Sequence, residues 1–268
     1  MNQPHVRSSF DGVSLNIRWN TIDQPKATLV IAHGLAEHLG RYDEFAAKLN
    51  EWGYNVLRYD QRGHGHSEGE RGYLASYSHL FLDCNEIVEA AKEAFPDLPV
   101  LLFGHSMGGY TATGYAILYP RHVKGIVFSG PLTLDTAGIL RSIDLNLDPH
   151  IQTPNALADA ICSDRKVVED YQNDPLTLKS IALGLMQEIA RSVPWIDAHL
   201  NEVVDPILVL HGEKDALVNV KDSEELYLRS ASTDKTRNVF DGLWHEILNE
   251  QRREEVYHVI HEWLDRHC

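Results

Sequence analysis

The chain has 268 residues and a formal net charge of −15, from 24 Lys and Arg against 39 Asp and Glu. This length suits a single domain built on one large sheet, and the acidic balance disfavours nucleic acid and strongly anionic membrane as partners. Three scattered cysteines without a CxxC pair predict neither a disulfide framework nor a zinc site. Because the N-terminal stretch also lacks the apolar core of a signal peptide, we expect a soluble protein of the cytoplasm.

Short runs rich in apolar and β-branched residues alternate along the chain with longer amphipathic stretches. The first run, VSLNIRW at 13–19, alternates strictly and predicts an antiparallel strand at the start of a sheet. Further strand candidates, each ending in turn residues, lie at 27–33, 54–60, 99–105, 123–130 and 205–212. Helical patterns separate them at 41–53, 78–95 and 110–120. This alternation predicts an α/β fold, a mostly parallel sheet with helices on both faces and ligand chemistry at the carboxyl ends of its strands.

Residues 131–204 interrupt this rhythm, because they carry helical patterns at 157–172 and 176–193 without strand signals. Such a length between two strands exceeds an ordinary crossover connection. We therefore predict a helical cap, or lid, inserted within a single domain that spans residues 1–268. The dense apolar pattern of 176–193 exceeds what one docking face requires, so Leu185 and Met186 are expected to meet an acyl chain.

A possible nucleophile follows the strand candidate at 99–105. The sequence Gly-His-Ser-Met-Gly at 104–108 links this strand to a helical pattern, an order typical of a nucleophile elbow, in which a tight turn exposes a strained serine. Side chains at Gly104 or Gly108 would collide with neighbouring backbone in such a turn. The pattern predicts Ser106 as a nucleophile, with a plain strand-to-helix turn as the alternative.

A serine hydroxyl is a weak nucleophile at neutral pH, so this hypothesis requires an orienting acid and a histidine base. The elbow resembles that of the α/β-hydrolases, in which the acid and then the base follow the serine on loops after late strands. Asp215 lies just past the strand candidate at 205–212 and is the predicted acid. Its rivals are Asp205, which precedes that strand, Asp222, which lies within the next helical pattern, and Glu213.

The predicted base is His245, which lies between a turn at 241–242 and the last amphipathic helix. The competing histidines fall on or beyond that helix, where a solvated face is expected: His258, His261 and His267. His64 and His66 suggest a metal pair, but no further ligand is near in sequence, and a polar loop explains them.

The oxyanion formed during acyl transfer needs two backbone donors. One is the N–H of Met107, the residue after the nucleophile. The other is expected from the loop after the strand candidate at 27–33, where Gly34 allows the backbone to turn and the N–H of Leu35 is the candidate donor.

These motifs together resemble the monoacylglycerol lipase and lysophospholipase-like branch of the α/β-hydrolases, over nearly the whole chain from about residue 8. The segments that carry the resemblance are HGLAEHLGRY (33–42), DQRGHGHSEGERG (60–72), GHSMGG (104–109), VVEDYQNDPL (167–176), LHGEKDALV (210–218) and WHEILNE (244–250). The resemblance implies hydrolysis of single-chain acyl esters of glycerol to fatty acid and glycerol, without a cofactor or a metal.

The same resemblance implies substrate-binding positions for three further side chains. Glu37 and Arg41 would lie behind the oxyanion loop near His245, and Tyr171 of the cap near the alcohol-binding end of the pocket. The alternatives are a surface i,i+4 pair for Glu37 and Arg41, and simple cap packing for Tyr171.

The cap departs from the pattern of the branch in one respect. Membrane-seeking members carry a strongly apolar helix at the start of the cap, whereas the stretch 137–154 is broken by Asp144, Asp148 and Pro149. We therefore expect a small acyl ester as the partner, with membrane contact at most weak and peripheral. A lysophospholipase or a short-chain carboxylesterase is the alternative within the class, and a non-catalytic ligand receptor of the same fold is the alternative outside it.

Overall fold

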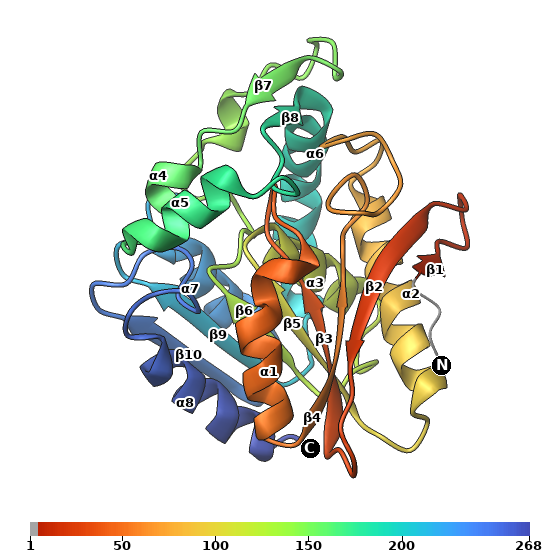
Figure 1. Ribbon diagram of the computed structural model, residues 1–268. Coiled ribbons are helices and arrows are strands. Elements are labelled where there is room, and N and C mark those ends of the chain that lie inside the picture. Colours follow the sequence, from red (N-terminus) through yellow and green to blue (C-terminus); the bar gives the residue numbers. More distant parts are fainter. Residues whose placement is uncertain (1–4) are drawn as a thin grey trace.

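A computed structural model describes residues 5–268 of the chain (Figure 1); the first four residues of the predicted domain lie outside the described residues. Eight strands form one sheet: β1 (His5–Arg7), β2 (Ser14–Asn20), β3 (Ala27–Ala32), β4 (Tyr54–Tyr59), β5 (Val100–His105), β6 (Ile126–Ser129), β9 (Ile207–Gly212) and β10 (Lys235–Phe240). Their order is β1-β2-β4-β3-β5-β6-β9-β10, with β1 and β2 antiparallel to their neighbours and all other pairs parallel. The predicted sheet is confirmed, and the antiparallel strand predicted at 13–19 is β2, which pairs with β1 and β4. The short strand β1, which precedes it, was not predicted.

Helices cover both faces of this sheet. On one face lie α1 (Asp43–Glu51) and α8 (Arg253–Asp265), and on the other lie α2 (Ser78–Ala94), α3 (Met107–Leu118) and α7 (Val220–Arg229) (Figure 1). Alternation along the strands supplies both interfaces, because successive side chains point to opposite faces. In β5, Leu101 and Phe103 pack with α1 and α8, whereas Leu102 packs with α2 and α3.

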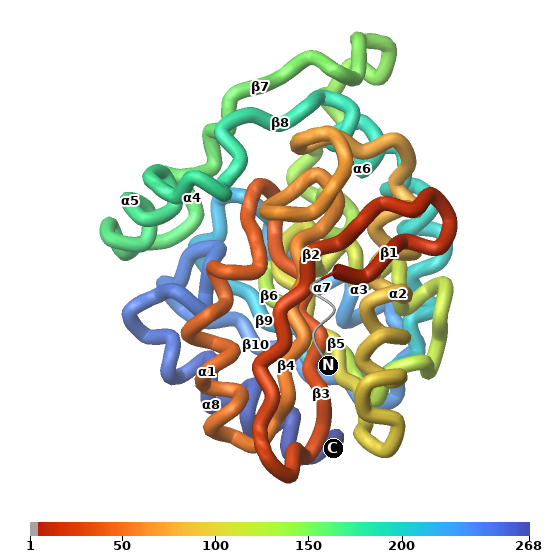
Figure 2. The backbone as a smooth tube through the Cα atoms, turned by 45° about the vertical axis from the view of Figure 1, so that its right-hand side comes forward, coloured from red at the N-terminus to blue at the C-terminus, as the bar shows by residue number. Residues whose placement is uncertain are grey.

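The predicted cap region, residues 131–204, connects β6 to β9 and lies largely above the carboxyl ends of the strands (Figures 1 and 2). Its elements are η2 (Leu140–Ser142), β7 (Gln152–Pro154), α4 (Ala158–Ile161), α5 (Arg165–Asn173), β8 (Ser180–Ala182), α6 (Leu183–His199) and η3 (Leu200–Glu202). None of the helices within residues 5–268 has both the length and the apolar character needed to cross a membrane.

Two helical predictions in the cap were wrong in detail. The helix predicted over 176–193 begins only at Leu183, because residues 180–182 form β8 and pair antiparallel with β7. This pairing joins segments far apart in sequence, so a local helical pattern does not reveal it. The pattern at 157–172 is divided into α4 and α5, because the backbone becomes extended at Cys162. Asp164 then caps α5 by accepting a hydrogen bond from the N–H of Lys166.

Candidate active site

Ser106 occupies the turn between β5 and α3 with φ 54° and ψ −116°, a strained conformation for a residue with a side chain. The two flanking glycines are required by close packing. A Cβ on Gly104 would collide with the carbonyl of Gly108, and a Cβ on Gly108 would collide with the carbonyl of Ala32 at the end of β3. The predicted strained turn and the predicted reason for its glycines are therefore confirmed.

The two residues predicted as acid and base are hydrogen bonded to each other. His245, between β10 and α8, donates from Nδ1 to Oδ2 of Asp215 over 2.6 Å. The other carboxylate oxygen of Asp215 accepts the N–H groups of Leu217 and Val218, each at 2.9 Å, which fixes the acid in place. Ser106 and His245 line the same cavity. No hydrogen bond joins them in the described residues, and such bonds often form only when substrate binds.

Burial and charge act in opposite directions on this pair. Burial favours neutral forms, but the Asp215 carboxylate, aided by Glu246 and Glu37, raises the pKa of His245 above its usual value. Burial would likewise raise the pKa of Asp215, yet His245 and His211 hold that pKa well below the ordinary range. An imidazolium formed at His245 is therefore stabilised by a carboxylate that stays ionised.

His211 is a part of this site that the sequence reasoning missed. It lies at the end of β9, is fully buried, and places Nε2 3.0 Å from Oδ2 of Asp215. His211 could have been found from the sequence by its position four residues before Asp215, within the segment LHGEKD. The rival acids lie elsewhere: Asp205 precedes β9, and Asp222 accepts hydrogen bonds from the backbone of residues 133–136.

The two predicted oxyanion donors, Leu35 and Met107, both line the cavity that contains Ser106. Within residues 5–268, neither backbone N–H donates to a protein acceptor, so both are free to bind a ligand oxygen. The role expected of Gly34 needs correction, because the left-handed residue of this loop is Ala36, with φ 63°. A Cβ on Gly34 would lie 3.3 Å from Cβ of Ser106, so this glycine allows close approach to the serine.

Glu37 and Arg41 form part of a buried network rather than a surface pair. Glu37 accepts hydrogen bonds from the N–H of Gly34 at 3.1 Å and from the hydroxyl of Tyr42 at 2.8 Å. Arg41 lies 3.3 Å from Glu37 and makes two hydrogen bonds to Glu246, at 2.5 and 2.9 Å. Burial opposes ionisation of Glu246, but Arg41 lowers its pKa to about 2. The network links the oxyanion loop to the residue after His245.

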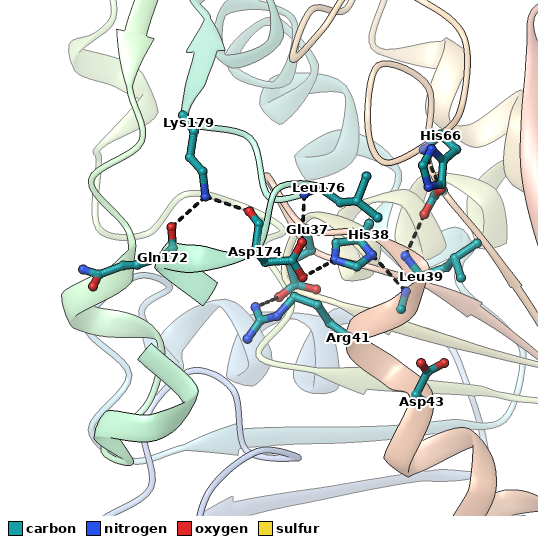
Figure 3. Close-up of polar contacts among 12 residues, drawn as sticks. Glu37, His38, Leu39, Arg41, Asp43, His66, Gln172, Asp174, Leu176 and Lys179 are labelled. Atoms are coloured by element: carbon teal, nitrogen blue, oxygen red, sulfur yellow. Dashed lines mark hydrogen bonds and ion pairs between the residues drawn. The ribbon is translucent and has the colours of Figure 1, made fainter. Parts of the chain in front are cut away.

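The same network reaches the cap (Figure 3). The guanidinium of Arg41 lies 4.7 Å from the ring centroid of Tyr171 on α5. His38 accepts the N–H of Gly40 at Nδ1, so Nε2 carries a proton and donates to Asp174 of the cap over 2.8 Å. Tyr171 lines the cavity as predicted. The contacts of His38 with Asp174 and of Arg41 with Tyr171 thus hold the cap against the segment that follows the oxyanion loop.

The shared cavity has a volume of about 160 Å³ and a mostly apolar lining. Apolar side chains from the cap and the neighbouring loops form its wall: Leu132, Leu140, Leu157, Ile161, Met186, Ile189 and Leu217. Met186 faces the cavity as predicted, but Leu185 does not line it. Leu185 is only 1% exposed and packs in the core, because residues adjacent on a helix point about 100° apart.

His105 does not line this cavity but is buried beside the predicted base, His245. It precedes the nucleophile, its ring centroid is 4.6 Å from that of His245, and burial lowers its pKa to about 4. This neutral, buried ring was not predicted from the sequence. His258 and His261 lie on α8 as predicted, and His261 stacks on Trp52.

Comparison with known proteins agrees with this architecture. The model of the family described as serine aminopeptidase, S33, matches residues 23–252. Monoacylglycerol lipase of Mycolicibacterium smegmatis is 34% identical, over 93% of this chain and 91% of its own. Monoglyceride lipase of Homo sapiens is 31% identical, over 98% and 90%. The crystal structure of Paleococcus ferrophilus monoacylglycerol lipase matches with a TM-score of 0.82 at 28% identity, covering 95% of this chain and 99% of that one. The chain therefore belongs to the serine aminopeptidase S33 family and is a monoacylglycerol lipase-like α/β-hydrolase.

Proposed function

We propose that this enzyme hydrolyses monoacylglycerols, or similar single-chain acyl esters, to a fatty acid and glycerol. One observation carries the proposal: a strained serine, a histidine–carboxylate pair and two free backbone N–H groups converge on one apolar cavity. The names of the relatives from Mycolicibacterium smegmatis and Homo sapiens support this substrate class.

In the proposed mechanism, His245 accepts the proton of Ser106 as the serine oxygen attacks the ester carbonyl. Asp215 holds the imidazole in the tautomer with a proton on Nδ1 and stabilises its charged form. The N–H groups of Leu35 and Met107 bind the developing oxyanion. His245 then protonates the leaving alcohol, and water attacks the acyl-enzyme with His245 again acting as the base.

The two ends of the cavity suit the two parts of such a substrate. The apolar wall, including Met186 but not Leu185, is proposed to bind the acyl chain. Glu37 and Tyr171 line the cavity and are proposed to bind the glycerol side. Arg41 does not line the cavity, and we propose that it acts by holding Glu37 and the ring of Tyr171 in place.

We also propose that residues 131–204 act as a cap over the site and that the enzyme works in the cytoplasm. The cap supplies much of the apolar wall, and contacts from His38 and Arg41 hold it in place. Cys84 and Cys162 are buried free thiols, which suits a reducing compartment.

The test is a series of 1-monoacylglycerols of increasing acyl length, compared with lysophosphatidylcholine and p-nitrophenyl esters. Release of fatty acid from monoacylglycerols with the highest kcat/KM, lost in Ser106→Ala, is the expected result. A higher kcat/KM for lysophosphatidylcholine would instead indicate a lysophospholipase, and a higher kcat/KM for short p-nitrophenyl esters would indicate a short-chain carboxylesterase. Covalent labelling of Ser106 by a fluorophosphonate without turnover of any ester would overturn the enzymatic proposal and favour a ligand receptor.

A further inference from the structure

A second hollow lies directly behind the wall of the catalytic cavity. This outer groove has a volume of about 420 Å³, and its apolar lining comes from Leu134, Ala190, Val193 and Pro194. Two residues, Asp135 and Leu140, line both the outer groove and the catalytic cavity. They therefore form the partition between the two spaces.

One stripe of α6 passes along both spaces. Met186 and Ile189 line the catalytic cavity, and Ala190 and Val193 line the outer groove. Their spacing of i, i+3, i+4 and i+7 places them on one face of the helix. The apolar surface that meets an acyl chain therefore continues beyond the partition, and Leu140 lies across it.

The partition is held rigidly at its base by two carboxylates. Asp222 on α7 accepts the backbone N–H groups of residues 133–136 at 2.9 to 3.1 Å, and the hydroxyl of Thr136 as well. Asp135, in a left-handed conformation with φ 50°, accepts the N–H groups of Ile139 and Arg141 at 2.9 and 3.1 Å. These bonds fix the backbone from which Leu140 projects.

The Leu140 side chain is 3% exposed and belongs to the hydrophobic core. Because the carboxylate of Asp135 is engaged by backbone donors, Leu140 supplies the apolar part of the partition. A shorter side chain at this position would join the catalytic cavity to the apolar side of the outer groove, which α6 lines with Ala190 and Val193. The remaining lining of the outer groove is polar or charged and includes Thr136, Arg141, Asp197 and Glu225.

We propose that Leu140 closes the acyl site and sets the longest acyl chain that the enzyme accepts, while the outer groove is a continuation that this side chain shuts off. The inference rests on the proposed ester hydrolysis. It assigns the selection of acyl-chain length to Leu140, in the first segment of the cap, whose backbone is held by Asp222.

The test is kcat/KM for 1-monoacylglycerols from C4 to C18 in the wild type, Leu140→Ala, Leu140→Val and Leu140→Phe. Each methylene buried in an apolar site is worth about fourfold in kcat/KM. The wild-type profile should rise and then level off. Leu140→Ala should continue to rise over several further carbons, Leu140→Val should do so to a smaller extent, and Leu140→Phe should level off earlier.

Leu134→Ala is the matched control, because Leu134 lines the outer groove alone and its truncation should leave the levelling point unchanged. If Leu140→Ala is unstable, the opposite shifts of the Val and Phe variants still decide the question. Unchanged profiles in these variants, with a wild type that cleaves monoacylglycerols, would overturn the role of Leu140 alone. A wild type that cleaves no monoacylglycerol would instead remove the proposed function.

Discussion

The strained backbone at Ser106 serves catalysis but lowers the stability of the fold. Its φ of 54° holds the side chain at the cavity but is unfavourable for any residue with a Cβ. We expect Ser106→Ala to lower kcat by about a millionfold and to keep the fold, since the nucleophile alone is lost. Ser106→Gly should be equally inactive but more stable than Ser106→Ala by roughly 1 kcal/mol. Fatty-acid release and urea unfolding measure both effects, and residual activity in either variant would place the nucleophile elsewhere.

The location of the base is tested by comparing histidines on neighbouring segments. His245→Ala should lower kcat by several orders of magnitude, because the proposed mechanism then lacks the base that accepts the serine proton. His258→Ala is the matched control, since its side chain is 71% exposed on α8 and pairs with Glu262 on the same helix. The kcat of that variant should stay within about twofold of the wild type. Essential His258 with dispensable His245 would contradict the assignment.

The pH profile reports the charges around the base. His245 must be neutral to accept a proton, so kcat/KM should fall as the pH drops through its pKa. Burial alone would lower that pKa, but Asp215, Glu246 and Glu37 raise it, so the inflection should lie above pH 6.5. Removing the Glu246 charge weakens this effect, so Glu246→Gln should move the inflection downward. Glu255→Gln, on the exposed face of α8, should leave it in place. An inflection below pH 6 in the wild type would contradict this electrostatic account.

Residues whose role follows from a local motif could be predicted from the sequence, and residues whose role follows from distant contacts could not. Ser106 and His245 each lie between a strand and a helix with characteristic turn residues, and the structure places them at one cavity. Glu246 acquires its role from Arg41, which is 205 positions away. Asp222 binds residues 133–136 across the cap insertion, which no local pattern reveals.

At the scale of elements, helical periodicity predicted α6 but not which of its faces meets the ligand. The apolar side chains of α6 serve two surfaces: Met186 faces the cavity, and Leu185 packs in the core. Position 184 is glycine because a Cβ there would press on Tyr73 and Pro149. Composition revealed the excess of apolar residues, but only the packing of α6 assigns each of them to a surface.

This division of α6 predicts opposite outcomes for two adjacent substitutions. Met186→Asp places a carboxylate against the acyl chain, so kcat/KM for long-chain esters should fall roughly ten- to a hundredfold, with little effect on a C2 ester. Leu185→Asp buries a charge in the core and should lower the free energy of unfolding by roughly 4 kcal/mol or more. Chain-length kinetics and urea unfolding of both variants measure the difference. If both variants lowered the free energy of unfolding equally, or if Met186→Asp lowered kcat/KM to the same extent at every acyl length, Met186 would not be part of the acyl site.

At the scale of the whole molecule, net charge and exposed apolar side chains have opposite effects on binding to lipid surfaces. The net charge of −15 repels anionic lipid surfaces. The first part of the cap nevertheless exposes four large apolar side chains, each 40 to 52% accessible, which we call the apolar patch: Ile139, Leu145, Leu147 and Ile151. Asp144 and Asp148 lie between them in sequence. Ile139 precedes Leu140 in sequence and also lines the catalytic cavity, so contact of this side chain with lipid would occur next to the acyl site.

These opposing properties predict an unusual dependence of vesicle binding on salt. Neutral phosphatidylcholine vesicles should bind the enzyme weakly through the apolar patch, and anionic vesicles should bind it less at low ionic strength. Because salt screens the repulsion, binding to anionic vesicles should increase from 10 mM to 500 mM salt, the reverse of a basic protein. Sedimentation with vesicles measures this, and a triple variant with serine at 139, 145 and 147 should bind neither kind. Tight binding to anionic vesicles that salt reverses would show that local charge at the cap, rather than the net charge of the molecule, controls contact with lipid.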